Sequence, residues 1–582
     1  MGIGDSVRET PLTRPAQGPD KPCIVRSGMY RRLQTVCLVC ALVMTGGLVA
    51  SVVHADESAT QRQLRHRMEA LQAHGKLTVS GVRITAVQLI AELYAQARFE
   101  RVWTDSNKVD ELLRAIADIR LDGLDPQDYY YDRLKKLRGE LGSPPDVGRQ
   151  VDLDILLTDA LARLAYNAFY GKVDPERIDR NINVTQTWTG ARGAAGVREF
   201  LASRSIYQKI DGLKPQRPKY QQFRKALARY RRYEEAGGWG RIPSGKVLSV
   251  ERSDPRVPAI RHRLAVTEDL PASLDNGNKF YDAELEKAVH RFQKRNRLPT
   301  GDLGRKTVLA MNVSVKQRID QIRVNMERAR WITRDVRPTQ VVVNIAAFEI
   351  FFLKDGKQVW RNEAQVGKTF TQTPLLVEEI DYLVLNPTWT VPPGVLEDSV
   401  LPAAKKDPRY VEKRGLRVFD SSGREVRASS VNWKSYTAST FPYTLRQNAG
   451  PDNPLGTVKF IFPNRHSVLL HDTPNQLGYD RRLRAMSWGC IHVQDPLELA
   501  AWLIDDKKDW SLAAIEAQVK SRKTKTIHFE TPVRVSLFYW TVDVSDDDLL
   551  IFYHDIYKRD RRVLRALNGP FRVRKTHRRG DD

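Results

Sequence analysis

The spacing of apolar residues predicts a helical first half. Between residues 60 and 235, apolar residues recur at i, i+3, i+4 and i+7, the spacing of an amphipathic helix that packs one face into a core. The two clearest stripes are Ile90, Leu93, Tyr94 and Ala97, and Leu157, Ala160, Leu161 and Leu164. Pro215, Pro218 and the run Gly237-Gly238-Trp239-Gly240 then interrupt the pattern. We therefore predict a helical scaffold domain over residues 56–250, in which no catalytic cluster stands out.

A shorter helical unit is predicted over residues 251–315. Asp282 is placed to cap a helix, and Gly301 and Gly304 provide turns before a second short helix. The apolar face of the first of these helices consists of Leu285, Ala288, Val289 and Phe292. A further helix, with Ile319, Ile322 and Met326 on one face, is predicted to connect this unit to the rest of the chain over residues 316–335.

After Pro338 the pattern changes to short runs of β-branched and aromatic residues, which favour strands. Asp355-Gly356 separates two such runs and predicts a hairpin. Strands are expected at 341–343, 348–353, 358–360, 382–385, 457–462 and 467–470. This pattern predicts a mainly β domain over residues 336–550. The polar segment 396–446 interrupts it and is long enough to be an inserted subdomain that covers a site, or a disordered loop.

The two ends of the chain differ from the rest. An apolar stretch over residues 33–53 follows Arg31 and Arg32 and ends in Val53-His54-Ala55, the layout of a secretory signal. Residues 1–55 are therefore expected to be a signal peptide or a membrane anchor, and Met29 is an alternative start. Either interpretation exports the remainder, and cleavage would follow Ala55. Residues 551–582 are expected to be a basic tail. The fold class predicted is a multidomain α+β protein.

Charge adds one constraint on partners. The formal net charge is +24, and an exported protein of this charge meets anionic lipid and anionic wall polymers first. No zinc-finger spacing, Walker loop or nucleic-acid module is present, so nucleic acid is not expected as a partner. The membrane is expected as a partner only through an uncleaved N-terminus.

Cys490 is the candidate nucleophile. The other cysteines, Cys23, Cys37 and Cys40, precede residue 55, so cleavage would leave Cys490 alone and unable to form an internal disulfide. A lone thiol in an oxidising compartment is a liability unless it does chemistry, although a small buried hydrophobe is the ordinary role of a cysteine. A thiol at its usual pKa of about 8.5 also needs a base or a cationic neighbour to react at neutral pH.

The surroundings of Cys490 supply such groups. His466, His471 and His492 are the nearby imidazoles, and His471 ends a predicted strand 19 positions before the cysteine. Gly489 lets the backbone turn, so that backbone N–H groups around 488–490 can face an oxyanion. After the cysteine, Asp495-Pro496-Leu497-Glu498 predicts a helix start with Asp495 as its N-cap.

Several segments resemble one family. His471-Asp472-Thr473-Pro474 followed by Ser487-Trp488-Gly489-Cys490-Ile491 looks like the signature of the L,D-transpeptidases. The segments NPTWTVP (386–392), NPLGTVKFIFPNRH (453–466) and QDPLELA (494–500) resemble the long periplasmic branch of that family. The resemblance implies a helical scaffold, a small peptidoglycan-binding domain and a catalytic β domain with a capping insertion, located in the periplasm.

The resemblance also implies roles for residues. Cys490 would attack the carbonyl between the third residue, a diamino acid, and the fourth, D-alanine, of a peptidoglycan tetrapeptide stem. His471 would move the proton, with the backbone carbonyl of Asp472 orienting its imidazole, and the backbone N–H groups of Trp488, Gly489 and Cys490 would hold the oxyanion. Tetrapeptide stems would be both donor and acceptor, and other wall-synthesis enzymes are a further class of partner. The resemblance implies no metal and no organic cofactor.

The substrate-binding residues expected from the resemblance are Ser487, His492, His466 and Trp389. Two positions depart from the family pattern. Trp488 stands where histidine or a small residue is common, and His492 stands where arginine or asparagine is common. His492 could make binding of a substrate carboxylate pH-dependent, or it could be a neutral residue packed beside the loop. Both interpretations stay open on the sequence.

Other functions remain to be weighed. The same acyl-enzyme with water as acceptor would make the protein an L,D-carboxypeptidase, and a binding scaffold with an inactive β domain is a third hypothesis. A papain-like protease would need its histidine roughly 130 to 150 residues after the cysteine. Only 92 residues follow Cys490, which excludes that arrangement.

Overall fold

The computed structural model describes residues 57–179, 182–183, 191–332, 336–506, 508–545 and 548–572. The chain divides into two units after Asp56, and everything described below lies in the second. The predicted signal or anchor and the last ten residues lie outside the described ranges. Among the helices within those ranges, none combines the length and apolar character that crossing a membrane requires.

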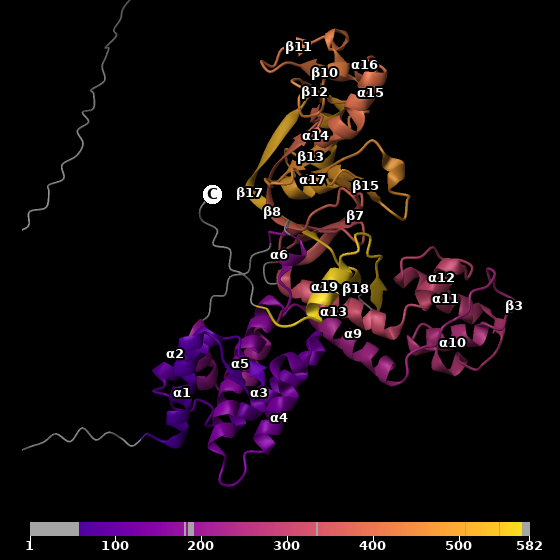
Figure 1. Ribbon diagram of the computed structural model, residues 1–582. Coiled ribbons are helices and arrows are strands. Elements are labelled where there is room, and N and C mark those ends of the chain that lie inside the picture. Colours follow the sequence, from indigo (N-terminus) through magenta and orange to yellow (C-terminus); the bar gives the residue numbers. More distant parts are fainter. Residues whose placement is uncertain are drawn as a thin grey trace, which may run out of the picture. The chain divides into compact units, whose positions relative to one another are not determined.

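The first part is helical, as predicted. Its helices (Figure 1) are α1 (Ala59–His74), α2 (Val87–Gln96), α3 (Ser106–Asp118), α4 (Tyr131–Gly139), α5 (Val147–Tyr170), α6 (Pro175–Ile178), α7 (Gly193–Ala202), α8 (Ile206–Gly212) and α9 (Pro218–Glu235), with a small hairpin of β1 (Thr78–Val79) and β2 (Val82–Arg83). The predicted stripe of Leu157, Leu161 and Leu164 is buried in α5. Asp154, also buried on α5, accepts hydrogen bonds from the hydroxyl of Tyr94 and the backbone N–H groups of Val102 and Trp103.

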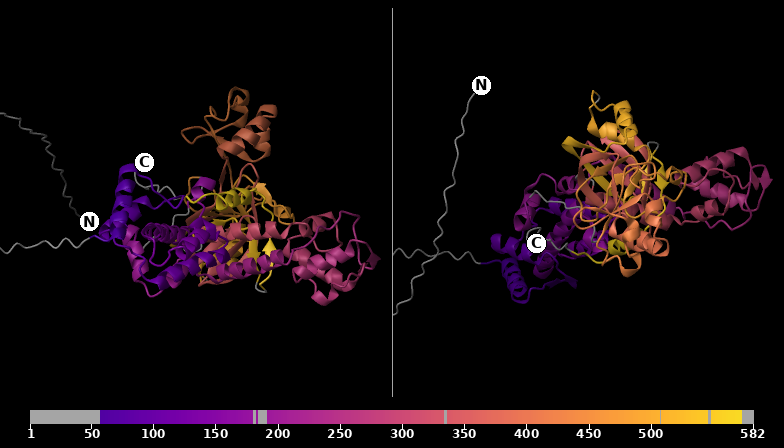
Figure 2. Two further views of the ribbon diagram at one scale, coloured as in Figure 1. Left: turned by 60° about the horizontal axis from the view of Figure 1, so that its bottom comes forward. Right: turned by 90° about the horizontal axis from the view of Figure 1, so that it is seen from above.

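The second helical unit has a hydrophobic core of its own. It comprises α10 (Val257–Val266), α11 (Ala283–Arg295) and α12 (Arg305–Met311), with the short strands β3 (Arg252–Ser253) and β4 (Phe280–Tyr281). The colour bar of Figure 2 identifies it as the pink helical part of the ribbon. The Asp282 carboxylate accepts the N–H of Leu285 at 2.9 Å, so the predicted N-cap is confirmed. Helix α13 (Val315–Ile332) follows and is buried over most of its length. The predicted helix 316–335 thus ends at Ile332 within the described residues.

The third part is a mainly β domain. Its large sheet has the order β15-β7-β16-β14-β13-β8-β17-β5-β6, and β6 also pairs with β7, so the strands from β7 to β6 close into a ring. The strands are β5 (Gln340–Asn344), β6 (Glu349–Lys354), β7 (Lys357–Gly367), β8 (Leu376–Leu385), β13 (Val458–Ile461), β14 (Leu470–His471), β15 (Ala485–Ser487), β16 (Ile491–Val493) and β17 (Lys525–Phe538). Helices α17 (Pro496–Ile504) and α18 (Leu512–Lys520) follow β16. The observed architecture is therefore the multidomain α+β fold that the sequence predicts.

The strand predictions hold with one exception. The hairpin at Asp355-Gly356 joins β6 to β7, and both turn residues have positive φ, at 52° and 79°. The run 467–470, in contrast, is not a strand before Leu470. The side chain of Asn464 accepts the N–H of Val468 and donates to its carbonyl, and Ser467 has a φ of 52°, so a turn precedes β14.

Residues 396–446 form an inserted subdomain with its own core, which includes Val400, Leu416 and Trp433. Besides coil it contains α15 (Leu401–Lys406), α16 (Tyr410–Lys413) and the strands β10 (Leu416–Phe419), β11 (Glu425–Val426) and β12 (Thr444–Gln447). With β9 (Trp389–Thr390) these strands form a sheet of order β11-β10-β12-β9. The alternative of a disordered loop is excluded.

The prediction of a basic tail from residue 551 is wrong as far as residue 572. Ile551 and Phe552 belong to β19 (Leu550–Phe552), which pairs with β18 (Val542–Val544). Helix α19 (Asp560–Leu567) follows, with Val563 and Leu567 buried. The basic residues of this helix face solvent. In the sequence they obscure the pattern of apolar residues that pack into the core.

Candidate active site

A row of polar side chains crosses three neighbouring strands of the large sheet. His471 on β14 is paired directly with His492 on β16, and His492 is paired with Gln365 on β7. Residues directly opposite each other share a face of the sheet. The adjacent positions Leu470 and Ile491 point the other way and are fully buried in the core. The sheet therefore has an apolar core face and a polar face that carries both histidines.

Cys490 lies on the polar face. It precedes His492 by two positions, and residues two apart in an extended chain share a face. The backbone N–H of Ile491 donates to the carbonyl of Leu469 at 3.1 Å, which fixes the cysteine beside the start of β14. Its thiol is partly exposed and lies 3.8 Å from the carbonyl oxygen of Ser467. Among the described residues, no hydrogen bond joins the sulfur to the imidazole of His471.

The imidazole of His471 is oriented by its neighbour. Its Nδ1 lies 2.5 Å from the backbone carbonyl oxygen of Asp472, and because a carbonyl only accepts, Nδ1 carries the proton and Nε2 keeps its lone pair. Burial lowers the pKa of His471 to about 4, and the positive charge of Lys459 contributes in the same direction. Burial likewise raises the pKa of the Cys490 thiol. At neutral pH both groups are therefore uncharged.

The nucleophile loop, residues 487–490, is held by side-chain hydrogen bonds. The hydroxyl of Ser487 donates to the carbonyl of Cys490 at 2.5 Å and accepts the N–H of Gly489 at 3.0 Å. Gly489 has a φ of 121°, in the region that glycine adopts without strain, and the hydroxyl of Thr373 donates to its carbonyl at 2.8 Å. Ser487 is buried and engaged at both ends. Its hydroxyl positions the loop. That Ser487 contacts substrate stays a prediction.

The hydrogen bonds of this loop also determine which of its N–H groups can bind an oxyanion. Because the N–H of Gly489 is taken by Ser487, it is not available as an oxyanion donor in this conformation. For the N–H groups of Trp488 and Cys490, no acceptor is found in the part of the chain that the structure describes. The three predicted donors are therefore reduced to two.

Three regions of the chain match family models. Residues 338–529 match the family described as the L,D-transpeptidase catalytic domain. Residues 88–227 match the family described as the scaffold domain, and residues 253–311 match one described as "Putative peptidoglycan binding domain". Residues 338–529 are therefore similar in sequence to L,D-transpeptidase catalytic domains. The segment contains Cys490, His471 and the polar face of the sheet.

One relative and two solved structures are similar to parts of the chain. A Haemophilus influenzae protein named "Putative L,D-transpeptidase" is 30% identical over 223 residues, which cover 38% of this chain and 45% of that protein. The chain thus matches less than half the length of this relative. The crystal structure of an L,D-transpeptidase from Xylanimonas cellulosilytica aligns at 14% identity over 51% of this chain and 99% of its own, with a TM-score of 0.18. One from Stackebrandtia nassauensis aligns at 12% identity over 51% and 96%, with a TM-score of 0.19. Both TM-scores are too low to indicate a shared overall arrangement.

His492 lies beside His471 as a neutral residue. Its Nδ1 donates to the Oε1 of Gln365 at 3.1 Å, and its ring centroid is 4.5 Å from that of His471. Burial, followed by the repulsion of His471, lowers the pKa of His492 well below 6.5. A side chain that stays neutral cannot make carboxylate binding pH-dependent near neutrality. The structure therefore favours the alternative of a neutral residue packed beside the loop.

Trp488 and His466 line a cavity of about 540 Å³ next to Gly489. Trp488 is 41% exposed and meets the ring of Phe370 edge to face, with the ammonium of Lys368 4.8 Å from the Trp488 ring centroid. Arg559, at the start of α19, forms another part of the lining and donates to the carbonyl of Thr373 at 3.2 Å. Sequence reasoning missed Lys368, Phe370 and Arg559, because they lie outside the motif segments and only folding brings them to the loop.

Trp389 is not brought to the nucleophile by any contact between described residues. It lies in β9, opposite Gln447, and packs against the core of the inserted subdomain. The expectation that it binds substrate is not supported by a contact with Cys490 or His471.

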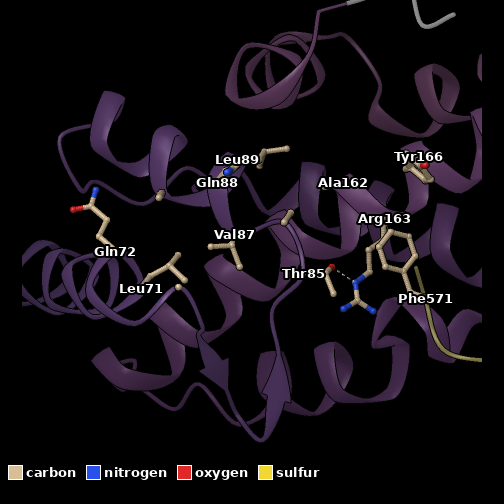
Figure 3. Close-up of a pocket in the computed structure, with 13 residues that line it drawn as sticks. Leu71, Gln72, Thr85, Val87, Gln88, Leu89, Ala162, Arg163, Tyr166 and Phe571 are labelled. Carbon is tan, nitrogen blue, oxygen red and sulfur yellow. Dashed lines mark hydrogen bonds between the residues drawn. The ribbon is translucent and has the colours of Figure 1, made fainter. Parts of the chain in front are cut away.

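A second cavity, of about 750 Å³, lies in the scaffold domain (Figure 3). Its lining is mainly apolar and includes Leu71, Val87 and Phe571, with Arg163 donating to the hydroxyl of Thr85 at 2.9 Å. No cysteine contributes to it. Within the described ranges, no cluster of three or more histidine, cysteine or carboxylate side chains is arranged to bind a metal ion.

Proposed function

We propose that the protein is an L,D-transpeptidase that joins the third residues of two peptidoglycan stems through a cysteine acyl-enzyme. The observation that carries the proposal is the placement of Cys490 on the same sheet face as His471, whose Nδ1–H is fixed on the Asp472 carbonyl. A nucleophile, a base with a free Nε2 and a group that orients the base are the three parts of a catalytic triad.

The first half of the reaction forms the acyl-enzyme. As the Cys490 sulfur attacks the carbonyl carbon between the third residue and D-alanine, Nε2 of His471 takes the thiol proton. The N–H groups of Trp488 and Cys490 stabilise the negative oxygen of the tetrahedral intermediate. The C–N bond then breaks, the D-alanine nitrogen takes the proton from His471, and D-alanine leaves.

The second half resolves the acyl-enzyme. The side-chain amine of the third residue of a neighbouring stem attacks the thioester carbonyl and gives a proton to His471. The C–S bond breaks and the sulfur recovers the proton. The product is an amide between two third residues, and the enzyme returns to its uncharged resting form.

The other domains fit a substrate in the wall. A peptidoglycan-binding domain matched at residues 253–311 can hold the enzyme on glycan strands while the stems react. We further propose that residues 1–55 export the protein to the periplasm, with residues 33–53 as the segment that remains if the N-terminus stays in the membrane. Tetrapeptide stems are then both donor and acceptor.

The test is the product formed from a purified disaccharide-tetrapeptide. Residues 57–582, which form one compact unit, are incubated with this substrate beside Cys490→Ala, and the products are identified by mass spectrometry. The expected product is a dimer that has lost one D-alanine and is absent with the variant. Tripeptide without dimer would make water the acceptor and the protein an L,D-carboxypeptidase. No change with either protein would contradict catalysis and leave a binding scaffold.

A carbapenem offers a second test of the nucleophile. We expect it to acylate Cys490 and to raise the intact mass by one molecule of the drug. The same mass increase in Cys490→Ser would show that another residue reacts and would contradict the assignment.

A further inference from the structure

Lys459 extends the polar row by one strand. It lies on β13, directly opposite His471 on β14, as His471 lies opposite His492 on β16. Its neighbours Val458 and Phe460 point into the core and are fully buried, so the Lys459 side chain is on the face that carries the histidines and Cys490. Neighbouring strands are about 4.8 Å apart. Cys490 directly precedes β16. The thiol, the imidazole and the ammonium group thus come, in that order, from the start of β16, from β14 and from β13, which are successive in the sheet.

Among the described residues, no carboxylate pairs with the ammonium group of Lys459. In the described part of the chain, neither a hydrogen bond nor an ion pair of this side chain is found, although it is half-buried. Asp472, the residue after β14, has a carboxylate that is engaged elsewhere. Its oxygens accept from the N–H and hydroxyl of Thr457, at 2.8 and 2.7 Å, and from the N–H of Thr473 at 2.7 Å.

A partly desolvated cation without a partner costs free energy, and an anionic ligand would recover it. The charge of Lys459 also acts on His471, because it is among the causes that lower the pKa of that imidazole. Lys459 is therefore placed to pair with an anion that binds next to His471.

The donor stem supplies such an anion at the matching place. Along the donor, the carbonyl carbon attacked by Cys490 is followed by the nitrogen that His471 protonates, and then by the α-carbon and the carboxylate of the leaving D-alanine. This order is the order of the three groups across β16, β14 and β13. We propose that Lys459 binds the terminal carboxylate of the donor stem and so selects stems that end at the residue to be released. The inference rests on the proposed function.

The test compares two donors that differ only in this charge. One is the disaccharide-tetrapeptide with a free D-alanine carboxylate, and the other is its C-terminal amide. Residues 57–582 and the variants Lys459→Met, Lys459→Arg and Lys525→Met are assayed for release of D-alanine or D-alaninamide. Lys525→Met is the control, because Lys525 is exposed on the opposite face of the sheet. Its neighbour Thr526 pairs with Val384, which in turn pairs with Lys459, so Thr526 and Lys459 share a face. Lys525, one position earlier on β17, therefore points to the other face.

We expect the unmodified chain to prefer the free acid. Lys459→Met should lower kcat/KM for the free acid about 10- to 100-fold, the range of one charge-assisted hydrogen bond, and leave the amide unchanged. Lys459→Arg should retain most of the preference, and Lys525→Met all of it. The loss should fall mainly on KM, because the carboxylate is bound before the chemical step.

Two results would overturn the inference. One is an equal loss on both donors in Lys459→Met while Cys490 is still alkylated by iodoacetamide at the original rate, which would make Lys459 a residue that acts only through His471. The other is an undiminished preference for the free acid in that variant. Lys459→Arg, which keeps the charge and much of the length, separates these results from misfolding. If the unmodified chain releases neither D-alanine nor its amide, the proposed function itself fails.

Discussion

At the scale of single residues, the reacting groups rest without charge. Burial holds the pKa of Cys490 above its ordinary value and that of His471 near 4, so a thiolate–imidazolium pair is disfavoured before substrate binds. The imidazole therefore acts as a general base while the sulfur attacks, instead of storing the proton in advance. This arrangement protects a lone thiol from oxidants, which react with the thiolate.

The pH dependence of alkylation tests this resting state. The thiolate is the reactive form, and below a raised thiol pKa its fraction grows about tenfold for each unit of pH. We expect the rate of iodoacetamide addition to residues 57–582, followed by intact mass, to rise from pH 6 to 8 without a plateau. Cys490→Ser should form no adduct. A plateau below pH 7 would indicate a thiolate already formed and would contradict the assignment of an uncharged pair.

Ser487→Ala tests the support of the nucleophile loop. The variant leaves the buried N–H of Gly489 without its acceptor and frees the carbonyl of Cys490, at an expected cost of about 1 to 3 kcal/mol. Urea denaturation measures this cost, and initial rates of D-alanine release should fall as the loop loosens. Ser273→Ala, an exposed serine of the second helical unit, is the control. Normal turnover with normal stability would mean that the loop does not need these bonds.

At the scale of elements, the inserted subdomain is built to be separable. The chain enters it through β9 and leaves through β12, and Trp389 is paired with Gln447, so the two ends lie next to each other. The subdomain also has a core that is distinct from that of the large sheet. The entry and exit can therefore be joined without disturbing the strands that carry Cys490 and His471.

Replacing residues 391–445 by a short glycine-serine linker tests whether the subdomain covers the site. We expect turnover of tetrapeptide stems to fall at least about tenfold, because a lid helps to orient a large substrate. Alkylation of Cys490 by iodoacetamide should persist, since a small reagent needs no lid. Equal loss of both activities, together with a lower melting temperature, would indicate misfolding. Undiminished turnover would contradict a role as a lid.

Local signals predicted the elements well wherever local interactions decide the structure. The cap at Asp282 is such a case, because the carboxylate bonds within its own helix. Asp495 looks equivalent in sequence, yet it has a φ of 48°, caps nothing, and accepts from the side chain of Asn362 at 2.9 Å. That tertiary contact on β7 overrides the local preference, and no pattern around Asp495 announces it.

The same distinction holds for the site. Cys490 and His471 could be paired from the sequence because their segments are close together and carry a recognisable motif. Gln365 and Lys459 could not, since only the register of β7 and β13 places them beside the histidines. Side chains at such positions look like ordinary polar residues of a strand until the pairing is known.

At the scale of the whole molecule, α13 ties the scaffold to the catalytic domain through buried polar groups. Asn325 accepts the backbone N–H of Thr541, which follows the long strand β17. Glu327, on the same helix, is fully buried and accepts the backbone N–H of Val173, beyond the end of α5, at 2.7 Å. It also pairs with Arg330 at 2.6 Å and accepts the indole N–H of Trp331 at 3.1 Å. Gly171 packs so closely that an added Cβ would lie 2.4 Å from the Glu327 carboxylate.

Glu327→Gln tests how much this junction contributes. The amide keeps the shape of the side chain but removes the negative charge that pairs with the buried guanidinium of Arg330. Breaking a buried pair in this way costs about 3 to 5 kcal/mol. We expect the urea midpoint of the scaffold transition to fall clearly. Glu284→Gln, which removes one half of an exposed pair with Lys287, is the matched control and should cost less than about 1 kcal/mol. Equal shifts in the two variants would mean that the Glu327 network adds no more than a surface pair. Alkylation of Cys490 is also measured in Glu327→Gln at urea concentrations below the unfolding midpoint, where the variant is folded. An unchanged rate would mean that the junction stabilises the molecule without shaping the site.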